Sequence, residues 1–281
     1  MTGVLVRIIG GLVLLLGLNQ TAFSQPRYPW LDHSENSART VAHIKLPPNT
    51  LRPAADSDSF ATWLRNLPLL PDTTPVRLYD GDLKGNQSAH AAIIDIDIGR
   101  RDLQQCADAA IRLRAEYLYS NSKDEEITFR FTSGDTASWQ KWAEGFRPKV
   151  NGNNVTWCRE SAADSSYQNF REYLDSVFMY AGTISLNRDL DHKADLCSTE
   201  PGDILLRGGS PGHAVIVLDI AIDTTTDQKY FLLAQSFMPA QNIHVLRNPS
   251  NFDLSPWYSC ECSDQVVTPE WTFRCTDLRS F

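Results

Sequence analysis

The sequence is short of positive charge. Its 281 residues include 26 lysines and arginines against 34 aspartates and glutamates, which gives a formal net charge of −8 at pH 7. Binding to nucleic acid depends on clustered Lys and Arg side chains that neutralise phosphates. The composition therefore argues against a nucleic-acid partner, and it is an equally poor match to an anionic membrane surface.

Long apolar runs are missing after residue 24, where no segment approaches the roughly 20 residues that a membrane-spanning helix needs. One apolar stretch occupies residues 8–18, between Arg7 and the small residues Ala22 and Ser24. This arrangement is typical of a secretory signal peptide cleaved near Ser24, although an uncleaved anchor would use the same residues. We therefore expect a periplasmic or secreted protein with no stable membrane insertion after cleavage.

Internal repeats and low-complexity linkers are also missing. Residues 25–58 are rich in Pro, Ser, Asn and Asp and predict an irregular lead-in. Residues 59–281 are long enough to bury a sizeable core, and we expect them to form a single domain.

Helical patterns dominate the first part of the chain and strand patterns the last part. Helices are expected over residues 57–69, 102–120 with Asp102 as N-cap, 136–146 and 166–186 with an end at Gly182. Strands are expected over residues 90–99, 125–134, 202–208, 213–222, 229–237 and 242–248, with one more near the C-terminus. Residues 147–166 are hydrophilic and fit neither pattern. This order predicts an α+β fold with helices packed on a mainly antiparallel sheet.

The six cysteines fall into two groups. Five lie in loop-like surroundings, where export favours disulfides: Cys158, Cys197, Cys260, Cys262 and Cys275. Zinc is the alternative, but Cys260 and Cys262 are closer together than the usual zinc-ligand spacing. The spacing does not determine which cysteines pair.

Cys106 differs from the other five because it lies near the start of a helical pattern. The dipoles at a helix N-terminus favour the thiolate, which is the nucleophilic form of cysteine. Cys106 is thus a candidate nucleophile, and its alternative interpretation is a buried structural cysteine.

A histidine follows a glycine-rich loop at the start of the apolar stretch 213–222. The loop carries Gly209, Ser210 and Gly212, whose small side chains leave room for a substrate to approach His213. These three residues are candidates for substrate binding. A surface histidine, or a core histidine with satisfied hydrogen bonds, is the alternative.

Gln235 is a polar residue near the end of the next apolar stretch. If the two stretches form a hairpin, Gln235 comes close to His213, and a catalytic base needs a third polar side chain to hold its ring. A buried glutamine that bonds only to the backbone is an equally simple interpretation.

The order of these residues resembles the papain-like cell-wall cysteine hydrolases of the NlpC and CHAP type. The likeness rests on a cysteine at a helix start, the stretch "GDILLRGGSPGHAVIVLD" and a polar residue in the following strand. It implies a papain-like fold with Cys106 as nucleophile, His213 as general base and Gln235 as the orienting residue. The chain departs from the usual Asp-Cys-Ser-Gly motif, with Gln105-Cys106-Ala107-Asp108 in its place.

A second resemblance covers more of the chain. The stretches 90–119 and 232–246 are similar to an uncharacterised bacterial family that is known only as a domain of unknown function. This likeness implies relatives and no activity.

The hydrolase resemblance implies a reaction and a substrate class. The amide of Cys106 would stabilise the oxyanion together with Gln104, Gln105 or His90. The implied substrate is a peptidoglycan stem peptide or another amide. The alternatives are a non-catalytic envelope module that binds a wall fragment, and a lipid acyltransferase of the same fold.

No cofactor is expected for this chemistry. Asp95 and Asp97 share one face of a predicted strand, and Asp102 and His90 lie nearby in the sequence, but no fixed third metal ligand accompanies them.

Overall fold

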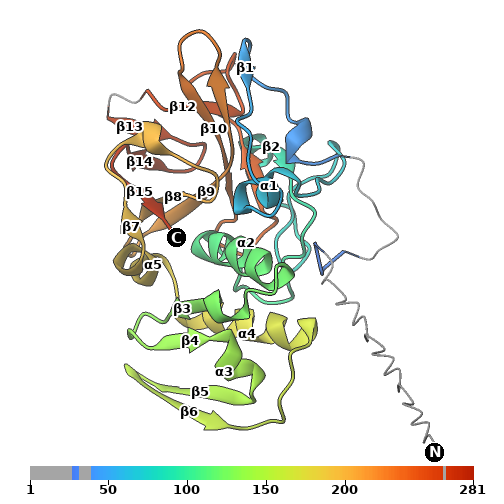
Figure 1. Cartoon of the computed structure of the whole chain (residues 1–281), viewed down its shortest axis with the longest axis vertical. Helices are drawn as coiled ribbons and strands as arrows, with labels where there is room; N and C mark the ends of the chain where they lie inside the picture. The colour runs from blue at the N-terminus through green and yellow to red at the C-terminus, as the bar shows by residue number, and fades with distance from the viewer. Residues whose placement is uncertain (1–26, 32–38, 262–263) are drawn as a thin grey trace, which may run out of the picture.

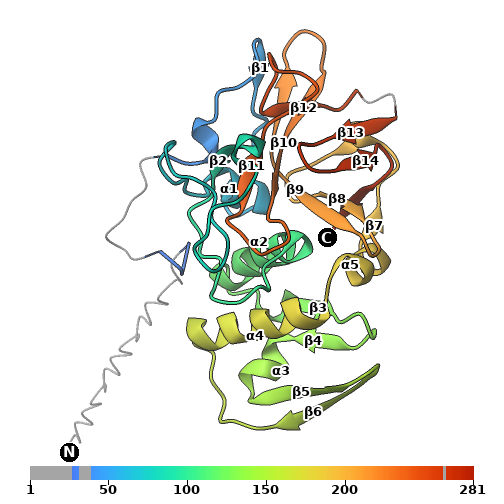
Figure 2. The ribbon, with the colours of Figure 1, turned by 180° about the vertical axis from the view of Figure 1, so that it is seen from behind.

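A nine-stranded antiparallel sheet forms the centre of the fold in the computed structural model, which describes residues 27–31, 39–261 and 264–281 (Figures 1 and 2). The strand order along the sheet is β2-β11-β10-β9-β8-β15-β7, with β1 paired to β9 and β12 paired to β10. The strands are β1 Thr50–Leu51, β2 His90–Ile93, β7 Asp191–His192, β8 Ile204–Arg207, β9 His213–Asp223, β10 Lys229–Gln235, β11 His244–Leu246, β12 Trp257–Ser259 and β15 Leu278–Ser280. The expected signal peptide lies outside the described residues.

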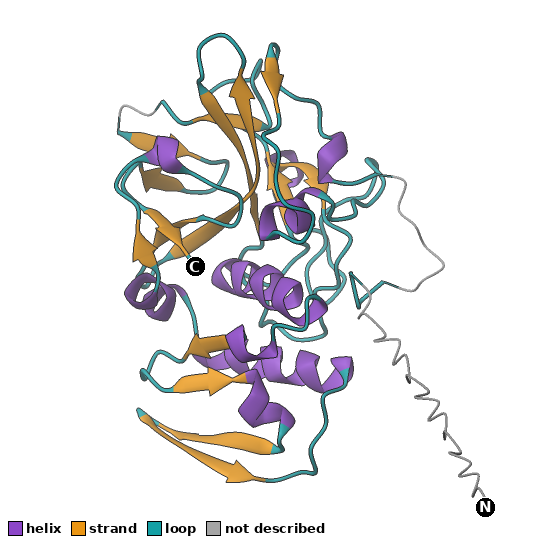
Figure 3. Cartoon of the chain, in the orientation of Figure 1, coloured by secondary structure: helices purple, strands orange, loops and turns teal. Residues whose placement is uncertain are grey.

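Five α-helices and three separate hairpins accompany this sheet in the described part of the chain (Figure 3). The helices are α1 Phe60–Arg65, α2 Cys106–Ser120, α3 Trp139–Ala143, α4 Tyr167–Tyr180 and α5 Thr183–Asp189. The hairpins pair β3 Thr128–Arg130 with β4 Thr136–Ser138, β5 Phe146–Asn151 with β6 Asn154–Arg159, and β13 Gln265–Val267 with β14 Thr272–Arg274. Short 3-10 turns cover Val41–His43, Gln87–Ala89, Asp124–Glu126 and Leu196–Ser198. The expected α+β class with a mainly antiparallel sheet is confirmed.

Strand β9 is apolar almost throughout because both of its faces are buried. Ala214 and Ile216 belong to the larger core cluster, on the face that α2 covers, whereas Val215 and Val217 belong to a second cluster on the opposite face. β10 pairs with β9 in the antiparallel register expected of a hairpin. The strand signal in this part of the sequence is therefore strong and correct.

Helix α2 begins later than expected. Its N-cap is Gln105, whose backbone N–H donates to the Asp108 carboxylate at 3.1 Å, and Cys106 is the first helical residue. Asp102, the expected N-cap, instead accepts a hydrogen bond at 2.7 Å from the backbone N–H of Ala240. The predicted cap is thus wrong, because a residue distant in the sequence engages its carboxylate.

α2 lies between the sheet and α4 in both views (Figures 1 and 2). The ring of Tyr119 stacks on that of Phe170 in α4 with centroids 4.3 Å apart. On the same helix, the buried Arg112 donates to Glu116 at 2.6 Å and to Asp97 at 3.0 Å. These contacts anchor α2 on both sides, so the position of its first residue is well defined.

Residues 147–186 contain a hairpin that the sequence pattern did not indicate, whereas the expected end of the long helix near Gly182 is confirmed. The hydrophilic stretch forms most of the β5–β6 hairpin, whose two-residue turn is Gly152-Asn153 between the paired residues Asn151 and Asn154, with Gly152 at a φ of 60°. Gly-Asn is a hairpin turn signal, and apolar residues alternate with polar ones on both strands, but no residue of either strand is fully buried. The long helix stops at Tyr180, and Gly182 then caps a separate helix, α5.

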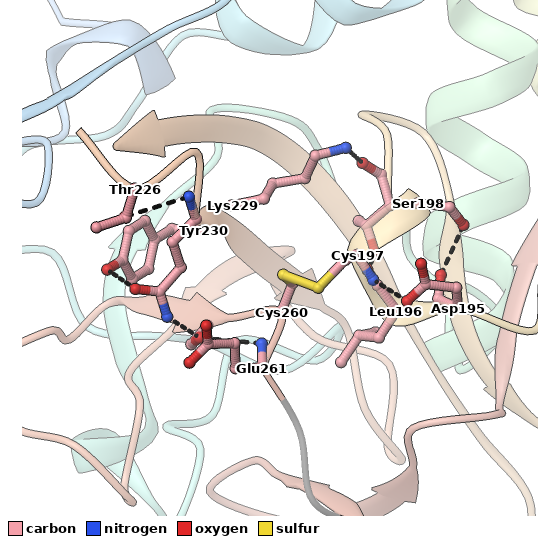
Figure 4. Close-up of a disulfide and its surroundings, with 12 residues drawn as sticks. Asp195, Leu196, Cys197, Ser198, Thr226, Lys229, Tyr230, Cys260 and Glu261 are labelled. Atoms are coloured by element: carbon pink, nitrogen blue, oxygen red, sulfur yellow. Dashed lines mark hydrogen bonds between the residues drawn. A yellow bond between two sulfur atoms is a disulfide. The ribbon is translucent and has the colours of Figure 1, made fainter. Parts of the chain in front are cut away.

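A disulfide joins Cys197 to Cys260, between the Leu196–Ser198 turn and the residue that follows β12 (Figure 4). Cys275 is disulfide-bonded as well. Cys158 is a free, exposed thiol on β6, so this member of the loop-like group takes no part in a disulfide. Cys262 lies outside the described residues.

None of the helices in the described ranges is both long and apolar enough to cross a membrane.

The fully buried carboxylate of Asp219 ties the lead-in segment and α1 to β9. It accepts hydrogen bonds from Arg52 at 2.6 Å and from Arg65 at 2.9 Å. We predict that Asp219→Ala lowers the free energy of unfolding by about 3–5 kcal/mol, because it leaves two guanidinium groups without their buried partner. Urea denaturation measures the loss.

The control for this experiment is Glu160→Ala, which breaks an exposed ion pair with Lys149. Exposed pairs contribute little, and we expect a change within about 0.5 kcal/mol. Equal effects of the two substitutions would contradict the role assigned to Asp219.

Candidate active site

Cys106 is a free, buried cysteine on the first turn of a fifteen-residue helix. The backbone amides of Ala214, Ala107 and Cys106 itself act on the thiol and lower its pKa, against the larger effect of burial. Ala214 is the second residue of β9, so the thiol lies against the start of that strand, directly beside the backbone of His213.

Cys106 opens onto a cavity of about 380 Å³. Gly209, Ser210 and Gly212 line the same cavity, so the structure brings the predicted nucleophile together with all three predicted substrate-binding residues. The full lining is Asp102, Leu103, Gln105, Cys106, Ala107, Asp108, Phe178, Met179, Ala181, Gly182, Thr183, Gly209, Ser210, Pro211, Gly212 and Met238.

Two walls of this cavity were not anticipated from the sequence. One is the α4–α5 junction at residues 178–183, and the other is Met238 in the loop after β10. The only sequence signal at the first wall was Gly182, which breaks the helical pattern. Met238 carries no local signal, because its place at the cavity depends on how β10 packs.

The structure also brings His213 and Gln235 together. The Nε2 atom of His213 lies 2.8 Å from the Oε1 atom of Gln235, and both side chains are buried. Three aromatic rings surround the imidazole, with centroid distances of 5.0 Å to Phe237, 5.3 Å to Trp271 and 5.8 Å to Phe273. This packing holds the ring in one plane against its glutamine partner.

Burial keeps both candidate catalytic groups neutral at pH 7. Desolvation lowers the pKa of His213 to about 4, and it raises the pKa of the Cys106 thiol to about 11. The backbone amide donors lower the thiol pKa, but burial outweighs them and the nearby Asp108 raises it further. The expectation that the helix start yields a ready thiolate is therefore wrong for this resting state.

No hydrogen bond joins the Cys106 sulfur to the His213 imidazole in the described part of the chain. The ring packs against Phe273 of the second core cluster, on the face of β9 opposite to α2. Within the described ranges, the one side-chain hydrogen bond of the His213 ring is to Gln235. The sulfur instead contacts the amide of Ala214, the next residue along the chain. His213 and Ala214 are the first two residues of β9. The imidazole belongs to the first of them, and the Cys106 thiol lies near the backbone of the second.

The three candidate oxyanion residues occupy different places. Gln105 lines the cavity. Gln104 is buried, and its side-chain oxygen accepts a hydrogen bond from Arg112 at 2.9 Å. His90 lies on β2, where its ring contacts that of His244 at 6.3 Å. Gln104 and His90 are not among the residues that line the cavity.

Asp97 also has a role other than the one weighed from the sequence. Its carboxylate accepts hydrogen bonds from Arg112 at 3.0 Å and from Arg171 at 2.9 Å, and these guanidinium groups hold its pKa at about 2 against the opposing effect of desolvation. Asp97 therefore serves an ion-pair network. Among the described residues, no group of three or more His, Cys, Asp or Glu is arranged to hold a metal ion.

Together these features define an α+β protein with a free cysteine at a helix start beside a buried histidine–glutamine pair. The chain belongs to the family described as "Domain of unknown function (4846)", whose model matches residues 41–280. No curated protein and no solved structure matches it. The family agrees with the second resemblance in the sequence, and the papain-like resemblance stays a prediction.

The buried histidines predict a dependence of stability on pH. Burial lowers the pKa of His213 to about 4 and that of His244 to about 3, whereas an unfolded histidine binds its proton near pH 6.5. Below pH 6.5 the unfolded state therefore binds more protons than the folded state. We expect the free energy of unfolding to fall between pH 6.5 and 4, by up to about 3 kcal/mol for each histidine.

Urea unfolding at a series of pH values measures this dependence. Its control is His213→Gln, which removes one of the two groups and should flatten the pH dependence between pH 6.5 and 4. An identical slope in the variant and the wild type would contradict a neutral, buried His213.

Proposed function

We propose that this protein is an exported cysteine hydrolase of papain-like architecture that cleaves an amide bond. In this proposal Cys106 is the nucleophile, His213 the general base and Gln235 the residue that orients the base. One observation carries it: a free cysteine at a helix start opens onto a cavity while its sulfur contacts the strand backbone beside a buried histidine–glutamine pair.

The reaction begins from two neutral groups. The Cys106 thiol gives its proton to a ring nitrogen of His213 as its sulfur attacks the substrate carbonyl carbon, so that proton transfer accompanies formation of the carbon–sulfur bond. The carbon–nitrogen bond then breaks, and the imidazolium returns the proton to the departing amine. Water, deprotonated by the now neutral His213, cleaves the thioester and restores the thiol.

Charge that develops on the carbonyl oxygen needs hydrogen-bond donors. The backbone N–H of Cys106 lies in the first turn of α2, where amides lack an intrahelical acceptor. Gln105 lines the same cavity, and its side-chain NH₂ group, which donates one hydrogen bond to Asp102 at 3.1 Å, has a second N–H to offer. These two residues are the proposed oxyanion donors, because they flank the attacking sulfur.

The cavity disfavours an anionic substrate group and offers an apolar rim. Its described lining includes no Lys, Arg or His that would pair with a carboxylate. Met179 and Met238 at its rim are exposed large hydrophobic residues, 43% and 63% exposed respectively. Methionine adapts its shape to apolar ligands. Among stem peptides and similar amides, the proposal therefore favours those with an apolar group next to the scissile bond.

Two alternatives each draw on one observation. The raised pKa of Cys106 favours a non-catalytic envelope module that binds a wall fragment in the same cavity. The methionine rim suits an acyl chain and favours a lipid acyltransferase that uses the same nucleophile.

The first test replaces the proposed nucleophile. We predict that Cys106→Ala and Cys106→Ser lower the release of soluble fragments from purified peptidoglycan at least about a thousandfold, because the covalent step is lost. Chromatography of the released fragments measures the rate. The matched control is Cys158→Ser, which removes the exposed free thiol on β6 and should leave the rate unchanged.

The same variants separate hydrolase from binding module. A wild-type protein that binds peptidoglycan but releases nothing, with binding unchanged in Cys106→Ala, would support the module. Turnover that persists in Cys106→Ala would end the assignment of Cys106 as nucleophile.

A second test concerns the apolar rim. We predict that the sulfur of Cys106 is acylated faster by p-nitrophenyl octanoate than by p-nitrophenyl acetate, as followed by intact-protein mass spectrometry. Met238→Glu should lower this preference about tenfold, because burial of the chain against the rim is lost. The control Phe252→Glu changes a residue that is 86% exposed and is not part of the cavity lining, and it should leave the preference intact.

A further inference from the structure

Gln235 is held at both ends of its amide. Its Oε1 atom lies 2.8 Å from the Nε2 atom of His213, and its Nε2 atom donates to Glu270 Oε2 at 2.7 Å. The same Glu270 oxygen accepts a hydrogen bond from Lys84 Nζ at 2.6 Å. A continuous chain therefore runs from Lys84 through Glu270 and Gln235 to His213.

The chemistry of these groups allows only one direction of hydrogen bonding. A carboxylate accepts hydrogen bonds and cannot donate them, and the same Glu270 oxygen already faces the Lys84 ammonium at 2.6 Å. The NH₂ group of Gln235 must therefore face Glu270, which turns its carbonyl oxygen toward His213. Because that oxygen only accepts, the Nε2 atom of His213 must carry the ring proton, and Nδ1 keeps the lone pair.

We propose that Glu270 is a positioning residue that fixes the tautomer of His213 through Gln235, so that Nδ1 is the basic nitrogen. The inference deepens the proposed function and rests on it, since it names the atom that takes the thiol proton from Cys106. Glu270 contacts neither the sulfur nor the imidazole in a hydrogen bond, and it acts only through the glutamine.

Burial makes the arrangement specific. Lys84 is 5% exposed and Gln235 is fully buried, so a reversed amide would turn its oxygen toward the Glu270 carboxylate and leave two acceptors facing each other with no water to compensate. The ammonium of Lys84 also lies 5.2 Å from the ring centroid of Phe237, which packs against His213. The charged pair and the imidazole thus share one enclosed environment.

The residues come from four separate parts of the chain. Lys84 precedes the Gln87–Ala89 turn, Glu270 lies in the β13–β14 turn, and His213 and Gln235 lie on neighbouring strands of the sheet. Backbone pairing already fixes the register of β9 with β10 and of β13 with β14, so these strands do not need the side-chain contacts for their register. The common effect of these contacts is on the orientation of the His213 ring.

Nitrogen NMR of protein labelled with ¹⁵N-histidine tests the proposal. The chain has six histidines, and the spectrum of His213→Gln assigns the signal of this one. We expect Nε2–H and an unprotonated Nδ1 at pH 7 in the wild type. In Glu270→Ala the Gln235 amide is free to reverse, and we expect the Nδ1–H tautomer to appear. Glu270→Gln keeps an acceptor oxygen at this position and should restore the wild-type tautomer.

The matched control is Glu200→Gln, which removes the carboxylate of another Lys–Glu pair, with Lys229, outside this chain of contacts. It should leave the His213 signals unchanged. An Nδ1–H tautomer in the wild type overturns the proposal, and so does an unchanged Nε2–H tautomer in Glu270→Ala. The wild-type spectrum decides the first point even if a variant does not fold.

Turnover separates this inference from the proposed function. If nine of ten Glu270→Ala molecules held the wrong tautomer, the rate of acylation of Cys106 would fall about tenfold and would recover in Glu270→Gln. A wild-type protein with the expected tautomer but with turnover insensitive to Cys106→Ala would refute the hydrolase and leave the tautomer control by Glu270 in place.

Discussion

The close packing of the first turn of α2 against the start of β9 is the contact on which the candidate site depends. Alanine on both elements makes it possible, because Ala107 and Ala214 add little bulk at the point of approach. The sulfur of Cys106 then reaches a strand amide directly. Beside it, the hydroxyl of Ser236 donates to the backbone oxygen of Gln104 at 2.8 Å, which ties the end of β10 to the residues that lead into the helix.

Desolvation is the main electrostatic consequence of this packing. It disfavours the charged forms of both the cysteine and the histidine, so Cys106 is a neutral thiol and His213 a neutral imidazole at pH 7. The charge that remains nearby is paired: Lys84 faces Glu270 at 2.6 Å. A buried pair of this kind contributes little net stability on its own. The Lys84–Glu270 pair instead fixes the orientation of the Gln235 amide, because a carboxylate at a fixed position determines which end of a neighbouring amide faces it.

The sequence predicts the elements of the site better than it predicts their surroundings. The apolar runs at β9 and β10 identify two strands, and hairpin geometry is enough to bring His213 near Gln235. The start of α2 was misplaced because Asp102 bonds to Ala240, 138 residues away, and no local pattern records such a contact. The same limit applies to Met238, whose place at the cavity is decided by tertiary packing.

The hairpin β5–β6 was overlooked for a different reason. Phe146, Pro148 and Val150 alternate with polar residues on one strand, and Val155 and Trp157 on the other. Both strands are short and none of their residues is fully buried, so the alternation is a weak signal within a hydrophilic stretch. Glu270 and Lys84 also escaped notice, because surface-type residues carry no sign in the sequence that they will be buried. For each of these residues, the sequence does not show which distant residue it will contact in the fold.

The assembly of the site from distant segments links its chemistry to the stability of the whole fold. The contacts that join Lys84 to Glu270, Glu270 to Gln235 and Gln235 to His213 span 186, 35 and 22 residues. The disulfide between Cys197 and Cys260 closes a segment that contains both His213 and Gln235 (Figure 4). Such a link restricts the unfolded chain and thereby favours the state in which the two strands pair. In an oxidising compartment, the cystine thus supports the same hairpin that places the imidazole beside its glutamine, although neither cysteine contacts the cavity.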